Sequence, residues 1–137
     1  MSGILLDTCA AIWVAENQAL APDAVAALDA AFDSGRPVFV SEITAWEVGM
    51  LVSRGRLALS QSPAIWFRRL AKIQGVRLAP LTVDHFVDSS FLPGAPPRDP
   101  ADRIFAATAR REGMTLMTRD GWLLDYSRQG HIQALAC

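Results

Sequence analysis

Residues 99–109 read DPADRIFAATA, and this stretch predicts the helix around which the rest of the chain is arranged. Asp99 is a typical N-cap and Pro100 a typical first helical residue, so the start of the helix is well signalled. Asp102 then lies in the first turn, where the positive end of the helix dipole favours an ionised carboxylate that can meet a cation. For this segment alone two interpretations stay open: a cation ligand, or ordinary charges at a helix N-terminus.

Length and composition favour one compact unit. The chain has 137 residues, enough to bury a substantial core, and we expect a single domain over residues 1–137. Although 51% of the residues are hydrophobic, no apolar run approaches the roughly 20 residues that cross a bilayer. The N-terminal apolar run is stopped at once by Asp7, so we expect no signal peptide and a cytoplasmic location. The surplus apolar surface is expected in a subunit interface.

Charge and cysteine usage narrow the function classes. The formal net charge of −1 excludes a generic basic nucleic-acid binder. Nearly all the cationic residues are arginine, with Lys72 the one lysine, and guanidinium groups bind phosphate bidentately. A nucleic-acid substrate therefore stays compatible, although the base composition of the source genome explains the skew equally well. Cys9 and Cys137 match no metal-site or disulfide spacing and are expected to be ordinary thiols, Cys9 a buried one.

Short apolar runs alternate with helical patterns along the whole chain. Strands are predicted at 3–6, 37–40, 76–79, 115–118 and 131–135. Helices are predicted at 10–16, from about 22 to 35, from 41 to 55, from 63, at 82–91, from 100 to 113 and at 122–127. This alternation is typical of an α/β fold with three layers, α/β/α, and a mostly parallel sheet of roughly five strands.

The spacing of several side chains predicts whether they face the core or the surface. In the helix at 82–91, apolar positions are expected to face inward, and so are four positions of the helix that starts at Pro63. These are Val83, Phe86 and Val87 in the first helix, and Ile65, Trp66, Leu70 and Ile73 in the second. The tryptophans are expected in the core or an interface. Both histidines, His85 and His131, are expected at the surface or at helix ends, outside any site.

Four carboxylates are predicted to converge. Asp7 and Asp120 follow strand ends, and Asp102 opens the helix before the second of these strands. Glu47 lies on the apolar face of the helix that Ser41 caps, where an unpaired charge needs a partner. Ligands of parallel sheets collect beyond the carboxyl ends of the strands. The mutual repulsion of four carboxylates is relieved by a hard divalent cation, Mg²⁺ or Mn²⁺, which supports phosphodiester hydrolysis without a protein nucleophile.

Four blocks of the sequence resemble the successive signatures of PIN-domain ribonucleases, and most closely those of VapC-type toxins of bacterial toxin–antitoxin operons. The blocks are ILLDT at 4–8, SEITAWEV at 41–48, DPADR at 99–103 and LMTRD at 116–120, so the resemblance covers essentially the whole chain. It implies an acidic pocket of Asp7, Glu47, Asp102 and Asp120. Asp7 and Asp102 are then the most direct Mg²⁺ ligands, with Asp120 close or ligating through water. Glu47 is expected to complete the shell or to orient the attacking water.

The resemblance also implies partners and supporting residues. It implies endonucleolytic RNA cleavage, a homodimer, and inhibition by a small VapB-like antitoxin that is the DNA-binding partner, so that DNA is met only indirectly. Thr8 and Thr118 are expected to hydrogen-bond the carboxylates, and Arg103 to pair with Asp99 or to approach the scissile phosphate. From the sequence itself, Arg54 and Arg56 flank Gly55 at a helix end and are either RNA contacts or part of a solvated turn.

A different Mg²⁺-dependent α/β domain is an alternative interpretation of the same acids. A receiver domain wants a lysine after a late strand, and a dehalogenase-type phosphatase wants a second aspartate two residues after the first, where this chain has Cys9. Both fit poorly. The alternative that stays open is a catalytically silent PIN-like binding module that acts through a protein partner.

Overall fold

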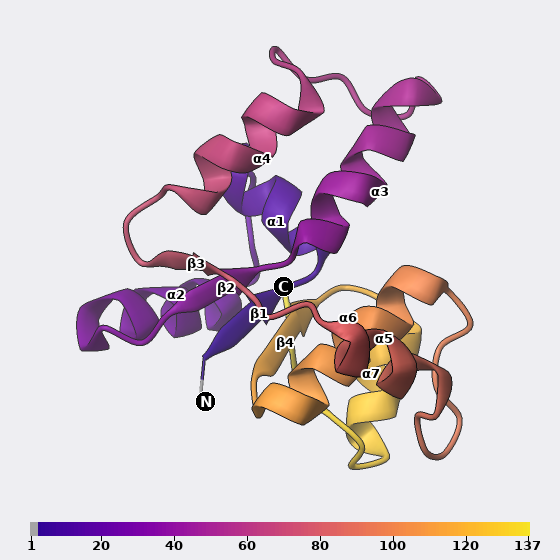
Figure 1. Cartoon of the computed structure of the whole chain (residues 1–137). Helices are drawn as coiled ribbons and strands as arrows, with labels where there is room; N and C mark the ends of the chain where they lie inside the picture. The colour runs from indigo at the N-terminus through magenta and orange to yellow at the C-terminus, as the bar shows by residue number, and fades with distance from the viewer. Residues whose placement is uncertain (1–2) are drawn as a thin grey trace.

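The computed structural model describes residues 3–137 and shows strands and helices in alternation (Figure 1). The N-terminal half contains β1 (Ile4–Leu6), α1 (Thr8–Ala15), α2 (Pro22–Ser34), β2 (Val38–Val40), α3 (Glu42–Ser53), α4 (Pro63–Ala71) and β3 (Val76–Leu78). The C-terminal half contains α5 (Val83–Ser90), α6 (Pro100–Glu112), β4 (Thr115–Thr118), α7 (Gly121–Arg128) and β5 (Gln133–Ala136). The predicted elements are all present, with bounds shifted by a few residues.

The five strands form one parallel sheet in the order β3-β2-β1-β4-β5. The chain winds outward from β1 to β3 and then returns to β4, which pairs with β1 on its other side. The strand order therefore reverses between β1 and β4, where open α/β sheets bind their ligands. Every residue of β1 and β2 is buried, as expected for central strands covered on both faces. The predicted α/β class is confirmed.

Helices cover both faces of the sheet, and alternate strand residues serve the two resulting cores. Ile4 and Leu6 pack into one cluster with Leu28 of α2 and Trp66 of α4. Leu5 points to the opposite face and packs with the second cluster, to which α6 and α7 contribute. In Figure 1 the helices α5, α6 and α7, drawn from salmon to yellow, lie together on one side of the sheet. The molecule is thus a three-layer α/β/α structure.

The predicted orientation of α5 is wrong. Val83, Phe86 and Val87 were expected to face inward, but their side chains are 75%, 46% and 51% exposed. His85, expected at the surface or a helix end, is buried in the first turn of α5, where its Nδ1 accepts the Thr82 N–H at 3.0 Å. The helix-end role is therefore confirmed and the surface position is not. The polar side of α5 faces α6, and its apolar side faces away.

Other side chains also differ from the expectation. Trp66 and Leu70 are buried as predicted, but Ile65 lies outside the buried stripe of α4 and Ile73 follows the end of that helix, so both are exposed. Cys9, expected to be buried, is exposed, because the second residue of α1 faces a cavity and not the core. Across residues 3–137, no helix combines the length and the apolar composition that a membrane crossing requires.

Candidate active site

The four predicted carboxylates line one open cavity of about 400 Å³ at the carboxyl ends of β1 and β4. This is the point where the strand order reverses, as the sequence argument required. The cavity brings in one further carboxylate, Asp99, which was predicted as a helix N-cap and as one of two alternative partners of Arg103, but not as a site residue. Its lining consists of Asp7, Thr8, Cys9, Glu47, Leu51, Asp99, Asp102, Arg119 and Asp120.

Asp7 and Asp120 are held by backbone and by one shared threonine. Asp7 caps α1, where its Oδ1 accepts the Ala10 N–H at 2.8 Å. Its Oδ2 accepts the hydroxyl proton of Thr118, whose oxygen in turn accepts the Asp120 N–H at 3.0 Å. Asp120 caps α7 by accepting the Leu123 N–H at 2.9 Å. The expected bond from Thr118 to a carboxylate is confirmed, and it ties the two strand-end acids together.

Glu47 is half-buried on α3 and receives a hydrogen bond from the Thr8 hydroxyl, as expected. The hydroxyl of Thr44, which is fully buried, lies 3.3 Å from that of Thr8. Thr8 has one hydroxyl proton and uses it on Glu47, so Thr44 is the donor to Thr8. Sequence reasoning missed Thr44, although its position three residues before Glu47 places it on the same side of the helix.

Asp102 and Asp99 share the N-terminus of α6. Asp99 caps this helix, and its Oδ1 accepts the Asp102 N–H at 3.0 Å. The expected pairing of Arg103 with Asp99 is wrong, because the Arg103 guanidinium donates instead to the carbonyls of Ser89 and Pro97, at 2.8 and 3.0 Å. Those two carbonyls hold Arg103 against the end of α5 and the following loop. Arg103 does not belong to the cavity lining.

Burial and the repulsion of neighbouring charges raise the pKa of three acids of the cavity, Asp102, Asp7 and Glu47. The pKa of Asp102 rises to about 8, first because of burial and then because of the neighbouring charges of Asp99, Asp120, Glu47 and Asp7. Burial also raises the pKa of Asp7 and of Glu47, while the hydroxyl bonds from Thr118 and Thr8 act in the opposite direction. A cation in the cavity would relieve this repulsion.

The carboxylates around the cavity fit a site for a hard divalent cation better than a structural metal site with an enclosed set of ligands. Within residues 3–137, no three histidine, cysteine, aspartate or glutamate side chains already enclose a metal position. A structural zinc site needs such an enclosed set of four ligands. Mg²⁺ instead keeps several waters and takes one or two carboxylates directly, which suits acids spread around an open cavity.

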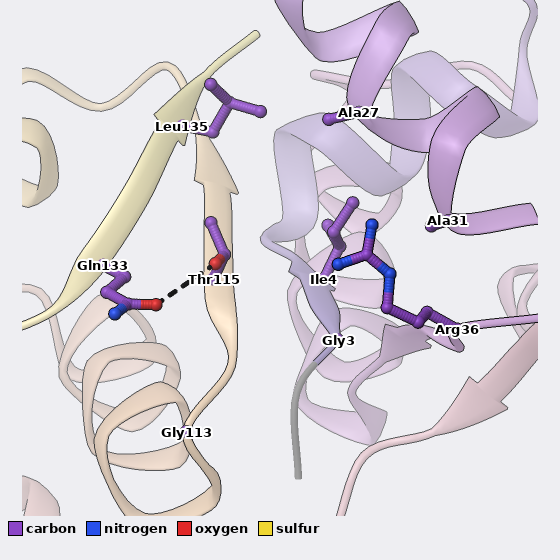
Figure 2. A pocket seen from close by; sticks show the side chains of 9 residues that line it. All are labelled: Gly3, Ile4, Ala27, Ala31, Arg36, Gly113, Thr115, Gln133 and Leu135. Carbon is purple, nitrogen blue, oxygen red and sulfur yellow. Dashed lines mark hydrogen bonds between the residues drawn. The ribbon is translucent and has the colours of Figure 1, made fainter. Parts of the chain in front are cut away.

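A second depression, of about 300 Å³, lies near the opposite ends of the same strands (Figure 2). There the Arg36 side chain, the bonded pair Thr115 and Gln133, and the small residues of α2 surround the space. Its lining contains no carboxylate. The acids are therefore concentrated at one end of the sheet, which separates the candidate site from this depression.

A parallel sheet with acids gathered at its switch point defines a class of metal-compatible α/β domains, and sequence comparison places the chain within it. The PIN domain model matches residues 4–128, and the chain belongs to the PIN domain family. Among characterised relatives, Ribonuclease VapC22 of Mycobacterium tuberculosis (strain ATCC 25618 / H37Rv) is 33% identical over 121 residues. The aligned part covers 88% of this chain and 88% of that protein.

Solved structures of the same fold include VapBC and FitAcB. VapBC2 from Rickettsia felis, bound to a DNA fragment from its promoter, is 13% identical with a TM-score of 0.64, covering 99% of this chain and 98% of that one. DNA-bound VapBC from Salmonella typhimurium is 16% identical with a TM-score of 0.60 and the same coverage. FitAcB from Neisseria gonorrhoeae is 20% identical with a TM-score of 0.54, covering 96% of each chain. At these identities the likeness establishes the fold.

Proposed function

We propose that this protein is a Mg²⁺-dependent endoribonuclease that hydrolyses RNA phosphodiester bonds as the toxin of a toxin–antitoxin pair. The observation that carries the proposal is the meeting of Asp7, Glu47, Asp102 and Asp120 around one cavity, from positions scattered over the whole chain. The similarity to Ribonuclease VapC22 supports RNA as the substrate class. We further propose that residues 1–137 form a single PIN domain.

Each acid has a role in this proposal. Asp7 and Asp102 bind Mg²⁺ or Mn²⁺ directly, and Asp120 binds it directly or through water. When bound, such a cation polarises the phosphoryl group and lowers the pKa of a water molecule. Glu47 completes the shell or orients the attacking water, and the hydroxyl of Thr8 fixes the position of its carboxylate. Thr118 holds Asp7 and Asp120 in a constant relation to each other.

The proposal also covers the protein partners and the cellular location. A small VapB-like antitoxin inhibits the nuclease, and DNA is bound only through that antitoxin; the fold shared with the VapBC and FitAcB complexes supports this partner. We also propose a homodimer, for which the apolar outer face of α5 gives support. The expected location is the cytoplasm.

RNA cleavage by the purified, partner-free protein tests the proposal. We expect Mg²⁺-dependent cleavage by the wild type, abolished by EDTA, and a loss of about 100-fold or more for Asp7→Asn and for Asp102→Asn, because each removes charge from the metal-binding set. Asp29→Asn, an exposed change on α2 outside the cavity lining, is the matched control and should keep full activity.

Two results would contradict the proposal in different ways. Equal cleavage by all variants, or cleavage that is indifferent to EDTA, would exclude the metal-dependent mechanism at these acids. Failure of the wild type to cleave any RNA with Mg²⁺ or Mn²⁺ would favour the silent binding module, in which the acids serve only the structure.

A further inference from the structure

Arg119 is the one cationic side chain among the residues that line the acidic cavity. It lies between the end of β4 and the start of α7, directly before Asp120. The sequence alone indicates no role for it. An arginine beside five carboxylates would ordinarily form an ion pair with one of them. The groups that Arg119 contacts instead therefore bear on its function.

The guanidinium of Arg119 is held by backbone oxygens and by an aromatic ring. Its Nε donates to the Cys137 carbonyl at 2.7 Å, and its Nη2 donates to the Ala19 carbonyl at 3.2 Å. The group also lies over the ring of Trp13. These contacts come from Cys137 after β5, from the α1–α2 connection and from α1. They fix the orientation of the guanidinium at the cavity, and none of them is a side-chain carboxylate of the cavity lining.

Arg119 forms no ion pair with the side-chain carboxylates of the cavity. Among residues 3–137 the arginine–carboxylate side-chain pairs within 4.0 Å join Arg111 and Arg128 to their acids, and Arg119 takes part in none of them. The raised pKa values of Asp7, Glu47 and Asp102 arise from burial and from one another. Two of the N–H donors of the guanidinium are used by carbonyls, so others stay available to a ligand.

We propose that Arg119 is a substrate-binding residue that holds a phosphate of the RNA beside the scissile one; this inference rests on the proposed ribonuclease function. RNA that approaches the cavity is a polyanion facing five carboxylates, so a fixed cation at the lining offsets part of the repulsion. The planar guanidinium suits phosphate oxygens, and its carbonyl contacts hold it in place before the RNA arrives.

The competing explanation is that Arg119 only holds the backbone at Ala19 and Cys137 in place. Arg103 provides a matched control, because its guanidinium is also held by two backbone carbonyls, those of Ser89 and Pro97, but lies outside the cavity lining. Loss of either arginine removes hydrogen bonds to two backbone oxygens. Loss of Arg119 alone removes a cation at the cavity.

The test measures RNA binding and cleavage by Arg119→Gln, Arg119→Lys and Arg103→Gln. Binding of a short single-stranded RNA is followed by fluorescence anisotropy over a range of NaCl concentrations, with each change placed in the Asp7→Asn background to prevent cleavage. We expect Arg119→Gln to weaken binding about 5- to 10-fold and to reduce the slope of log affinity against log salt by about 0.7, the value for one phosphate contact on a single strand. Arg119→Lys keeps the slope, and Arg103→Gln keeps both affinity and slope.

Cleavage kinetics with Asp7 intact give a second readout. We expect Arg119→Gln to raise KM by a factor similar to its loss of affinity while kcat changes by less than about twofold, the signature of lost ground-state binding. An unchanged salt slope, a lysine variant as defective as the glutamine variant, or a fall in kcat at constant KM would overturn the inference.

The two proposals fail separately. If the wild type cleaves no RNA but its binding retains the slope that depends on Arg119, the nuclease function is wrong and the phosphate contact stands. If the wild type cleaves RNA and Arg119→Gln matches it in KM and salt slope, the nuclease function stands and the phosphate contact is wrong.

Discussion

Three threonine hydroxyls set the direction of the acidic side chains. Thr118 joins Asp7 to the backbone of Asp120, and Thr8 bonds to Glu47. Thr44, which is fully buried, donates a hydrogen bond to the hydroxyl of Thr8. Because a carboxylate that acts on water must keep a constant orientation, these uncharged residues are expected to affect the cleavage rate although they carry no charge.

The replacement Thr44→Val tests this support at constant side-chain volume. Without the donated proton Thr8 can turn away from Glu47, and we expect kcat to fall about 5- to 10-fold, since one hydrogen bond contributes about 1 kcal/mol. In a Glu47→Gln background the same replacement should add little, because the two residues act through one contact. The measurement is the initial rate of RNA cleavage in a double-mutant cycle.

Thr108→Val is the matched control for this experiment. Thr108 is also a buried threonine in a helix, but its hydroxyl donates to the Ile104 carbonyl within α6 at 2.8 Å and touches none of the acids. Its replacement should leave kcat unchanged. Equal losses for Thr44→Val and Thr108→Val would show a general packing effect and would contradict a specific role for Thr44.

The functional residues that could be predicted from the sequence are placed by strand ends, whereas the missed residues are placed by contacts between distant segments. Asp7 and Asp120 follow strand ends, so a parallel sheet was enough to predict that they meet. Arg119 bonds to Ala19, 100 positions away, and Thr8 contacts Thr44, 36 positions away. Such contacts depend on how α1 and its following loop pack, which local patterns do not specify. The role proposed for each carboxylate still depends on the cleavage experiment.

At the level of elements, α5 shows why periodicity alone can mislead. Its apolar positions share one face, as predicted, but the opposite face makes the contacts with α6: His85 lies 3.4 Å from Glu112, and Asp88 accepts from Arg111 at 2.7 Å. A helical pattern shows that two faces differ, but it does not show which of them meets the protein. Here the polar contacts with α6 determine which face of α5 packs against the protein. The exposed side chains are those of Val83, Phe86, Val87 and Phe91.

This exposed stripe predicts where a homodimer would form. Phe86 and Phe91 alone expose on the order of 250 Å² of apolar surface, taking about 150 to 250 Å² for an aromatic side chain, and the two exposed valines add to it. A standard interface buries about 800 Å² per partner with an apolar centre, so the stripe is large enough to supply that centre but not the whole contact. A twofold axis through α5 would bring two identical apolar stripes together.

The replacement Val87→Arg places a charge within the stripe, and we expect it to convert the dimer to a monomer at micromolar concentration. Arginine is a good helix former, so α5 itself should persist. Ala30→Arg, at an exposed position of α2, is the control and should stay dimeric. Sedimentation or light scattering after gel filtration gives the mass directly. A monomeric wild type, or a dimeric Val87→Arg, would exclude this interface.

For the molecule as a whole, the central strands were more predictable than the edges. Ile4-Leu5-Leu6 and Val38-Phe39-Val40 are continuous apolar runs and form fully buried strands. The edge strands β3 and β5 are partly exposed, so their composition constrains them less, and the last strand begins at Gln133 where 131 was predicted. The α/β class followed from the alternation itself, which the parallel order of all five strands confirms.

The acidic cavity should also make the stability of the whole molecule depend on pH when no metal is present. In the folded protein the pKa of Asp102 is about 8, whereas an aspartate of the unfolded chain has a pKa of about 3.9. Between these values the folded state holds a proton that the unfolded state has released, so folding becomes less favourable as the pH rises. The raised pKa values of Asp7 and Glu47 act in the same direction.

We therefore expect the metal-free protein to melt at a lower temperature at pH 8 than at pH 5, by about 2–5 °C. Millimolar Mg²⁺ should restore the loss at pH 8, since a cation bound only by the folded state stabilises it by mass action and offsets the repulsion among the acids. Asp102→Asn, which cannot ionise, should flatten the pH dependence in EDTA and weaken the response to Mg²⁺. Scanning calorimetry of both proteins in EDTA and in Mg²⁺ measures all four conditions at each pH. A melting temperature that rises from pH 5 to pH 8 in EDTA, or an Asp102→Asn variant with the wild-type slope, would mean that the repulsion in this cavity does not limit the stability of the fold.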